Sequence, residues 1–224
     1  MKTEIEKNKI RIRREERRRQ ICQGAMKIFR KKGFNATTMR EIAKASEVSL
    51  GNVYNYINKK EDILFLIHND VLDTIYGELD AVLASYDDPV EQLVNVVGKV
   101  YDLTCRLKDE MLFIYTETKS LKKQQMRKVL QRESQFVARI ESLIGKVAEK
   151  GRFKYEDPDL VANLVAFVMA VYPLRGWNIL PRRSKEELRE SLIRFIMRGA
   201  GVPAKEIVRY SFTGFERLPD RREY

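Results

Sequence analysis

The sequence predicts an all-α protein in which a small N-terminal three-helix domain precedes a larger helical domain. Apolar residues recur at steps of three and four in every long segment, and no segment shows the period-two alternation of strands. The net charge of +11 is confined to one part of the chain, because residues 1–60 contain 17 Lys and Arg against 6 Asp and Glu, whereas residues 61–224 contain 26 of each. Binding to a polyphosphate partner explains such a division.

The first 20 residues are almost entirely charged, with the run KNKIRIRREERRR at their centre. They form either a solvated, partly disordered tail or a helical extension of the first helix that contacts the backbone or minor groove of DNA. The amphipathic helix that follows has Ile21, Ala25, Ile28 and Phe29 on one face, and Gly33 is predicted to end it.

Residues 38–57 predict two short helices joined by a tight turn. Thr38 and Glu41 form a capping box before the first helix, and Ser49 is predicted to cap the second. Val53 and Ile57 of the second helix face inward, which leaves its polar and aromatic side chains outside. This arrangement is a helix-turn-helix.

The outward side chains of the second helix suit DNA. Asn pairs bidentately with adenine, while Tyr and Ser hydroxyls and helix N-terminal amides suit phosphates. We assign Asn52 and Asn55 to base edges, and Tyr54 and Lys60 to phosphates; an ordinary helical hairpin with a polar face is the alternative. The predicted DNA-binding residues are Thr38, Arg40, Ser49, Leu50, Asn52, Tyr54, Asn55, Tyr56, Lys59 and Lys60.

The stretch from Gly24 to Leu64 resembles the N-terminal domain of TetR-family transcriptional repressors. The resemblance implies a homodimer that binds a palindromic double-stranded DNA operator and is released by a small-molecule effector. Two residues depart from the pattern, since Glu47 stands where the family has Gly and Ile57 where it has Phe. A non-Gly residue in a left-handed turn costs about 1 kcal/mol, so we expect some strain there. The matching residues are Ala25, Phe29, Gly33, Thr38, Ile42, Ala43, Val48, Ser49, Tyr54, Lys60 and Leu64.

A long helix is predicted to follow the helix-turn-helix, opening at Asn58, where Glu61 repeats the capping pattern, and ending near Asp87. It connects a DNA-binding domain, residues 1–63, to an effector-binding and dimerisation domain, residues 64–224. His68 on this helix is either a ligand-binding residue or a packed side chain.

The rest of the chain predicts helices only. Caps open them at Asp88, Ser120, Asp157 and Ser184, and a short apolar segment, 111–116, follows a charged break at 108–110. The helix from Asp157 is predicted to run through VANLVAFVMAVYPLRGWNIL and is apolar nearly all round, so it must be buried on several sides. The family resemblance implies a dimeric four-helix bundle there; the core of a monomer is the alternative.

The same resemblance implies an effector pocket among the middle helices. A guanidinium within the apolar run YPLRGW needs an anion, and Glu117 is a protein candidate, although a solvent-facing Arg175 is the alternative. The segments ETKSL, VLQRES and YPLRGW are similar to the branch of the family that responds to fatty acids or acyl-coenzyme A. The candidate ligand-binding residues, which plain core packing also explains, are Tyr101, Cys105, Phe113, Tyr115, Glu117, Phe167, Tyr172 and Arg175.

Other classes of protein fit the sequence poorly. One His, no nucleophile–base constellation and no phosphate loop argue against an enzyme, and Cys22 and Cys105 have neither disulfide nor metal-ligand spacing. We expect no cofactor. The apolar run from Val161 to Leu174 is too short to span a membrane and the N-terminus has no apolar signal core, so we expect a cytoplasmic protein. A nonspecific nucleoid-like DNA binder would explain the charge but not the large apolar domain.

Overall fold

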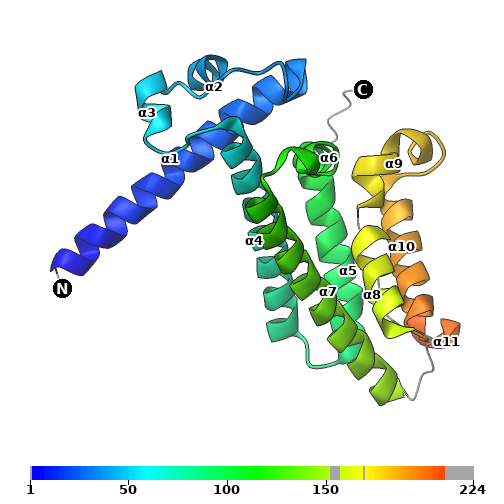
Figure 1. Ribbon diagram of the computed structural model, residues 1–224. Coiled ribbons are helices and arrows are strands. Elements are labelled where there is room, and N and C mark those ends of the chain that lie inside the picture. The colour runs from blue at the N-terminus through cyan, green and yellow to red at the C-terminus, as the bar shows by residue number, and fades with distance from the viewer. Residues whose placement is uncertain (1, 152–156, 169, 210–224) are drawn as a thin grey trace. The chain divides into compact units, whose positions relative to one another are not determined.

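The computed structural model describes residues 2–151, 157–168 and 170–209, with side chains from Glu6 onward. The described residues form helices and no strand, which confirms the all-α prediction (Figure 1). The helices are α1 (Lys2–Lys32), α2 (Met39–Ala45), α3 (Leu50–Tyr54), α4 (Lys60–Ser85), α5 (Pro89–Arg106), α6 (Lys108–Glu117), η1 (Thr118–Ser120), α7 (Lys123–Gly151), α8 (Pro158–Val168), α9 (Val171–Ile179), α10 (Lys185–Gly199) and α11 (Ala204–Ile207).

The chain divides into two compact units. The first contains residues 1–70 and 113–129, and the second contains residues 71–112 and 130–224. Helices α4, α6 and α7 therefore each contribute residues to both units. The predicted domain boundary after residue 63 stays a prediction, and the first unit extends beyond it along α4.

Local sequence signals explain the helix ends of the first unit. The Thr38 hydroxyl accepts from the Glu41 N–H (3.3 Å), and the Glu41 carboxylate accepts from the Thr38 N–H (3.0 Å), which completes the predicted capping box. Gly33 ends α1 with a φ of 82°, a conformation that costs glycine little. The charged N-terminal residues are part of α1, which begins at Lys2, as the helical alternative predicted.

Helix α4 begins two residues later than the predicted cap at Asn58. The Lys59 N–H donates to Asp62 Oδ2 (3.1 Å), so the reciprocal half of a capping box forms one residue further along than the Asn58–Glu61 pattern. The sequence holds two overlapping pairs with the same spacing, and only the three-dimensional path of the chain after buried Ile57 decides between them.

The second unit follows its predicted caps at α5 and α10. Asp88 caps α5, and Ser184 with Glu187 forms a complete capping box at α10. The predicted charged break at 108–110 is wrong, because these residues form the first turn of α6, where Asp and Glu favour the positive helix end. The start of α7 at Ser120 is also wrong, since residues 118–120 form a 3-10 turn and the Lys122 N–H donates to Gln125 Oε1 (3.2 Å) at the true start.

The predicted single helix over 157–180 consists of two helices, α8 and α9, bent by 61°; residue 169 between them lies outside the described residues. Pro173 explains the break, because proline cannot donate an intrahelical hydrogen bond and is tolerated only in a first turn. The start is as predicted, with the Leu160 N–H donating to Asp157 Oδ1 (3.0 Å). Among the described residues no single helix has the length and apolarity to cross a membrane, although α8 and α9 pass those criteria as a bent pair.

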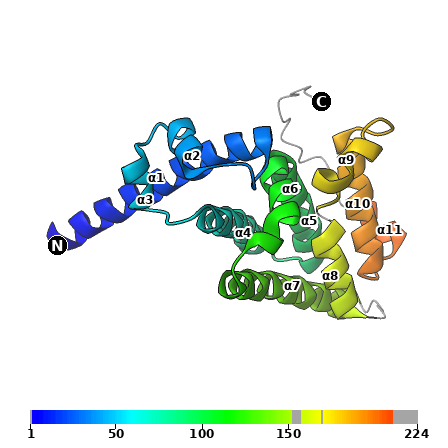
Figure 2. The same ribbon diagram turned by 45° about the horizontal axis from the view of Figure 1, so that its top comes forward.

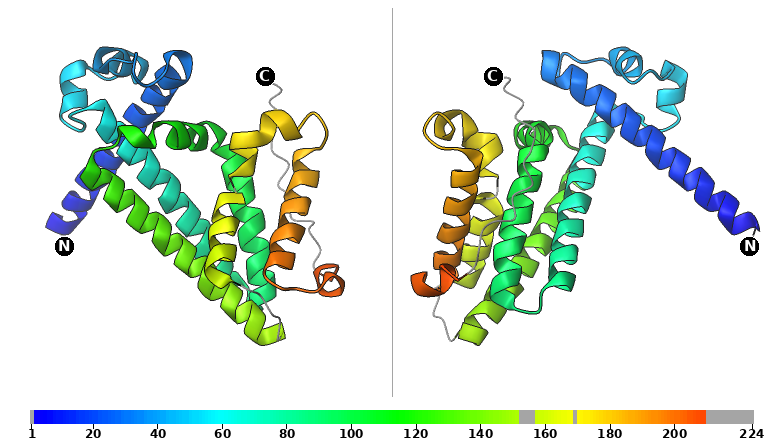
Figure 3. Two further views of the ribbon diagram at one scale, coloured as in Figure 1. Left: turned by 45° about the vertical axis from the view of Figure 1, so that its right-hand side comes forward. Right: turned by 180° about the vertical axis from the view of Figure 1, so that it is seen from behind.

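In the second unit α10 packs against both α5 and α8 (Figures 1 and 3). A buried ion pair joins α10 to α5, since Arg189 Nε donates to Asp102 Oδ1 at 2.9 Å. Gly98 makes room for this guanidinium, because a Cβ there would lie 2.3 Å from Arg189 Nη2.

Candidate nucleic-acid interface

Helices α2 and α3 present most of the predicted DNA-binding residues to solvent. Ile42 and Val53 are fully buried and hold the two helices against the unit's core, so the opposite faces point outward. Leu50 and Tyr56 are half-buried. Exposed residues of the predicted set are Thr38, Arg40, Ser49, Asn52, Tyr54, Asn55 and Lys59.

The recognition helix α3 is short but well defined. The Ser49 hydroxyl accepts from the Asn52 N–H (3.3 Å), which caps its start. The Asn55 side-chain amide donates to Asn52 Oδ1 (3.4 Å), so the two residues assigned to base edges lie side by side. Both side chains lie on an exposed surface, as base readout in a major groove requires.

The turn between α2 and α3 is fixed against α1. Glu47 has a φ of 55°, in the left-handed region, and is the only non-Gly residue with positive φ among those described. The preceding Ser46 is buried, and the Gln20 side chain donates to its carbonyl oxygen (2.6 Å). At Gly24 a Cβ would lie 2.7 Å from Ser46 Cα, so α1 and α2 approach as closely as they do only because residue 24 is glycine.

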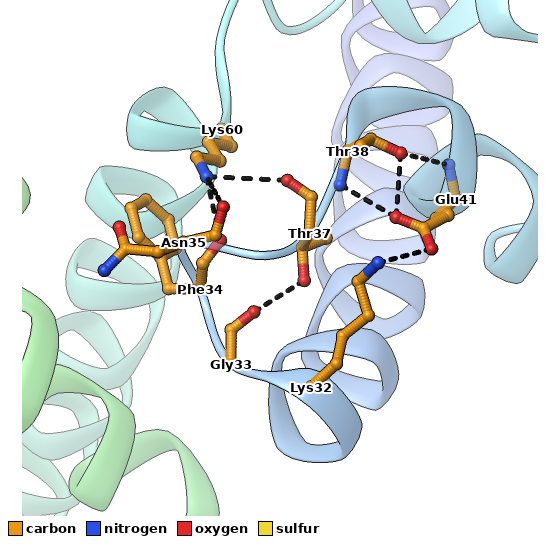
Figure 4. Close-up of polar contacts among 8 residues, drawn as sticks. All are labelled: Lys32, Gly33, Phe34, Asn35, Thr37, Thr38, Glu41 and Lys60. Carbon is orange, nitrogen blue, oxygen red and sulfur yellow. Dashed lines mark hydrogen bonds and ion pairs between the residues drawn. The ribbon is translucent and has the colours of Figure 1, made fainter.

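Lys60 is engaged inside the unit (Figure 4). Its ammonium donates to the carbonyl oxygens of Phe34 (2.9 Å) and Asn35 (2.9 Å), reaches that of Thr37 (3.4 Å), and lies 4.7 Å from the centroid of the Phe34 ring. All three ammonium donors thus have acceptors in the loop between α1 and α2. The assignment of Lys60 to phosphate stays a prediction, and the neighbouring exposed Lys59 is better placed to offer a free ammonium.

An ion pair between the end of α1 and the first turn of α2 supports the capping box. Lys32 bonds to the Glu41 carboxylate, and this hydrogen bond, with those from Thr38, lowers the pKa of Glu41 to about 2 (Figure 4). Glu41 therefore stays charged at the N-terminus of α2, where a negative charge is favourable.

Residues 113–129 pack onto the rest of the helix-turn-helix unit through several side-chain contacts. The Phe113 ring stacks on Phe29, with centroids 4.8 Å apart and an interplanar angle of 11°. Gln125 donates to Asp62 at the start of α4 (3.0 Å). His68 Nε2 lies 3.2 Å from the Thr118 hydroxyl, and burial lowers the pKa of this His to about 4, which favours a packed, neutral imidazole.

The candidate ligand-binding residues divide between the two units. Tyr101 and Tyr172 pack edge to face in the core of the second unit, 6.4 Å between centroids, with Cys105 against them. Burial raises the pKa of Cys105 to about 12, so it is a neutral thiol.

The other candidates lie elsewhere. Phe113, Tyr115 and Glu117 belong to the first unit. Phe167 is 57% exposed, and Arg175 is exposed over the Trp177 ring (5.4 Å), in keeping with the solvent-facing alternative. Sequence spacing carried no signal for this division, because it depends on which parts of α6 pack on the first unit.

A basic helix-turn-helix unit with an exposed, capped recognition helix defines the class of DNA-binding regulatory proteins. The family model described as "Bacterial regulatory proteins, tetR family" matches residues 21–67, and the model "Tetracyclin repressor-like, C-terminal domain" matches residues 86–200. The chain belongs to the TetR family and is a transcriptional regulator.

Individual relatives agree. The HTH-type transcriptional regulator HbdR of Aromatoleum sp. (strain CIB) is 30% identical over 173 residues, 77% of this chain and 76% of that protein. The HTH-type transcriptional repressor KstR2 of Mycolicibacterium smegmatis is 30% identical over 80 residues, 36% of this chain and 39% of that protein. A crystal structure of AibR in complex with isovaleryl coenzyme A and operator DNA shares the fold, with a TM-score of 0.68 and 22% identity over 80% of this chain and 97% of AibR.

Proposed function

We propose that this protein is a homodimeric repressor that binds a near-palindromic operator in the cytoplasm and leaves it when a small apolar acyl effector binds. The observation that carries the DNA-binding part is the outward face of α3, which offers Asn52, Tyr54 and Asn55 on the unit that holds the chain's excess positive charge. The name of the relative KstR2, a repressor, supports the direction of regulation.

Base readout and phosphate contact give different mutational signatures. Replacing Asn52 or Asn55 by Ala should relax preference at particular operator positions and cost about 1–3 kcal/mol per bidentate pair. Tyr54→Phe should instead weaken binding equally at all sequences, because phosphate contacts carry no sequence information. Gel shifts with operator variants across a salt series measure both. Equal losses at every sequence for the Asn variants would remove the base-reading assignment.

The competing view is a nonspecific DNA binder. Footprinting separates the two, because a repressor protects a short palindrome and a nonspecific binder coats the DNA uniformly. Uniform coating of every tested promoter fragment would overturn the proposal.

The effector part of the proposal is a fatty acid or its coenzyme A thioester. It is supported by the sequence likeness of ETKSL, VLQRES and YPLRGW, and by the isovaleryl coenzyme A named in the AibR complex. Within the second unit, the Tyr101–Cys105–Tyr172 cluster is the aromatic group against which an acyl chain would pack. Release requires that the ligand bind the DNA-incompetent conformation more tightly, since equal affinity for both conformations shifts nothing.

A chain-length series of acyl-coenzyme A and free fatty acids tests the effector by calorimetry and by operator release. We expect binding and release for at least one member, and both should weaken in Tyr172→Ala. If none of them binds, the acyl effector is wrong, while the operator footprint still decides the repressor function independently.

The dimer surface is proposed on α8 and α10. Leu160, Leu164 and Phe167 follow one another at steps of four and three and are all exposed, as is Phe195 on neighbouring α10. A second copy of the chain, related by a two-fold axis, would cover this apolar face and present two recognition helices to major grooves about 34–36 Å apart.

A further inference from the structure

The N-terminal part of α1 is a straight, exposed, basic helix. Residues 6–19 contain eight Lys and Arg against three Glu, and residues 6–16 are all exposed. None of the ion pairs between described side chains involves this stretch. Figures 1 and 2 show it projecting from the first unit past α3, on the side of the recognition helix. We call residues 6–19 the arm.

One face of the arm looks toward the helix-turn-helix. Lys9, Arg13, Arg17, Gln20 and Gly24 follow at steps of four, four, three and four, so they share one helix face. At its inner end this face meets the turn between α2 and α3, because the Gln20 side chain donates to the Ser46 carbonyl and Gly24 abuts the same residue.

A second row of cations points elsewhere. This row follows steps of four, three, four and four residues, so its members share a second face of the helix. They are Lys7, Arg11, Arg14, Arg18 and Cys22. Cys22 is buried in the unit, and Phe29, further along this row, stacks on Phe113 rather than on the helix-turn-helix. The two rows carry the same charges on one helix but face different surroundings.

We propose that Lys9 and Arg13 bind backbone phosphates of the DNA that flanks each operator half-site. This rests on the proposed function, because DNA held by α3 lies on the side of the arm that carries this row. From Gln20 back to Lys9 the helix rises roughly 16 Å, which corresponds to about five nucleotides of one strand. A cationic helix that is already formed loses little conformational freedom on binding, and an Arg guanidinium matches a phosphate bidentately. The contacts are independent of sequence, so the partner is duplex backbone rather than a particular flanking base.

The test compares two matched pairs, Lys9→Gln with Arg13→Gln, and Lys7→Gln with Arg11→Gln. Each pair removes two charges from neighbouring turns of the same helix. Affinity is measured against salt for the operator with natural flanks and for a duplex trimmed to the protected palindrome. Because the proposed dimer has two arms, the first pair removes four phosphate contacts. It should lower the salt slope by about 3.6 on the flanked DNA, with each phosphate contributing about 0.9, and should shorten the hydroxyl-radical footprint. It should not change the slope on trimmed DNA.

The second pair should leave the slope and the footprint of flanked DNA unchanged. An equal decrease of the salt slope in both pairs would mean that the arm attracts DNA only through its overall positive charge. An unchanged salt slope in both pairs would mean that the arm does not contact DNA. Each result overturns the inference. Circular dichroism checks that both pairs keep α1 helical. If the wild-type protein protects no palindrome at all, the proposed function fails, which is distinguishable from failure of the arm alone.

Discussion

Glu47 occupies a backbone conformation that favours glycine, since at a φ of 55° its Cβ crowds the following carbonyl oxygen. We expect Glu47→Gly to raise the free energy of unfolding by up to about 1 kcal/mol, reduced by glycine's greater freedom in the unfolded chain. Urea denaturation measures the change. Gly33→Ala is the opposite control: it has open space around its Cβ but a φ of 82°, and it should lower stability. Equal effects of the two changes would contradict a strain at Glu47.

Lys59 and Lys60 are adjacent residues with different surroundings, and they make a matched pair. Lys60→Gln removes the ammonium from the carbonyl oxygens of Phe34 and Asn35, so it should lower the stability of the first unit by about 1–3 kcal/mol. Lys59→Gln should leave stability unchanged and reduce the salt slope of DNA binding by about 1.8, about 0.9 for each subunit of the proposed dimer. Denaturation and gel shifts on both variants separate the roles. If Lys60→Gln instead lowered the salt slope as far as a lost phosphate contact should, with unchanged stability, the assignment of Lys60 to a phosphate would be supported.

His68 makes stability depend on pH. Its pKa falls from 6.5 to about 4 on folding because burial disfavours the charged imidazole. The unfolded chain therefore binds more protons within that window, and stability is full above pH 6.5 and falls as the pH drops toward 4, by about 1.4 kcal/mol per unit at most. Urea denaturation of wild type and His68→Gln across the window should show a smaller pH slope in the variant. Parallel slopes would show that other groups cause the loss.

At the scale of elements, the Arg189–Asp102 pair fixes α10 against α5. Both side chains are largely buried, so Asp102→Asn removes the negative charge beside a buried guanidinium and should destabilise the protein by about 3 kcal/mol. The double variant Asp102→Leu with Arg189→Met removes both charges and should recover most of this loss. Thermal denaturation of the single and double variants measures it. If the loss of stability in the double variant equalled the sum of the losses in the two single variants, the ion pair would not be the cause of the destabilisation.

The helices that sequence predicted well are those whose signals are local. The boxes at Thr38 and Ser184, and the cap at Asp88, each need only a hydroxyl or carboxylate and an amide within three residues. The same locality explains the error at Asn58, where a neighbouring pair with equal spacing forms the bond instead. The bend before Pro173 could have been predicted from the proline, but the continuous apolar run favoured a single helix.

The sequence could predict site residues only where the apolar periodicity of a helix shows which side chains are exposed. The outward face of α3 was predicted from the inward spacing of Val53 and Ile57, and both are buried. The predicted extent of that helix to Ile57 is wrong, because α3 ends at Tyr54 and Ile57 lies in the segment that follows. The carbonyl cage around Lys60 joins residues 23–26 positions apart, and the Phe113 stack joins α6 to α1. No pattern along the chain encodes such contacts, because they depend on the tertiary path of the loop.

At the scale of the whole molecule, we expect a dimer through α8 and α10. Phe195 is 61% exposed, so Phe195→Glu should put a charge into the interface without disturbing the core of one chain, and should give a monomer. Leu192→Arg is a less clean test, since Leu192 also packs on the Tyr101 cluster. Light scattering measures the mass, and Leu130→Glu, another exposed apolar position, is the control that should remain dimeric. A monomeric wild type at micromolar concentration would contradict the architecture.

The close approach at Gly24 also limits which substitutions this sequence can accept during evolution. An added Cβ there meets the backbone of Ser46, so no second-site change at position 46 can rescue a side chain at 24. At Gly98 the obstacle is the far end of the Arg189 side chain, and shortening that residue would reopen the position. A pairwise mutational scan should therefore find one glycine that is intolerant in every background and another whose tolerance depends on residue 189. The glycine at position 24 would then stay constant as the helix-turn-helix evolves, whereas positions 98 and 189, where α5 packs on α10, could change together.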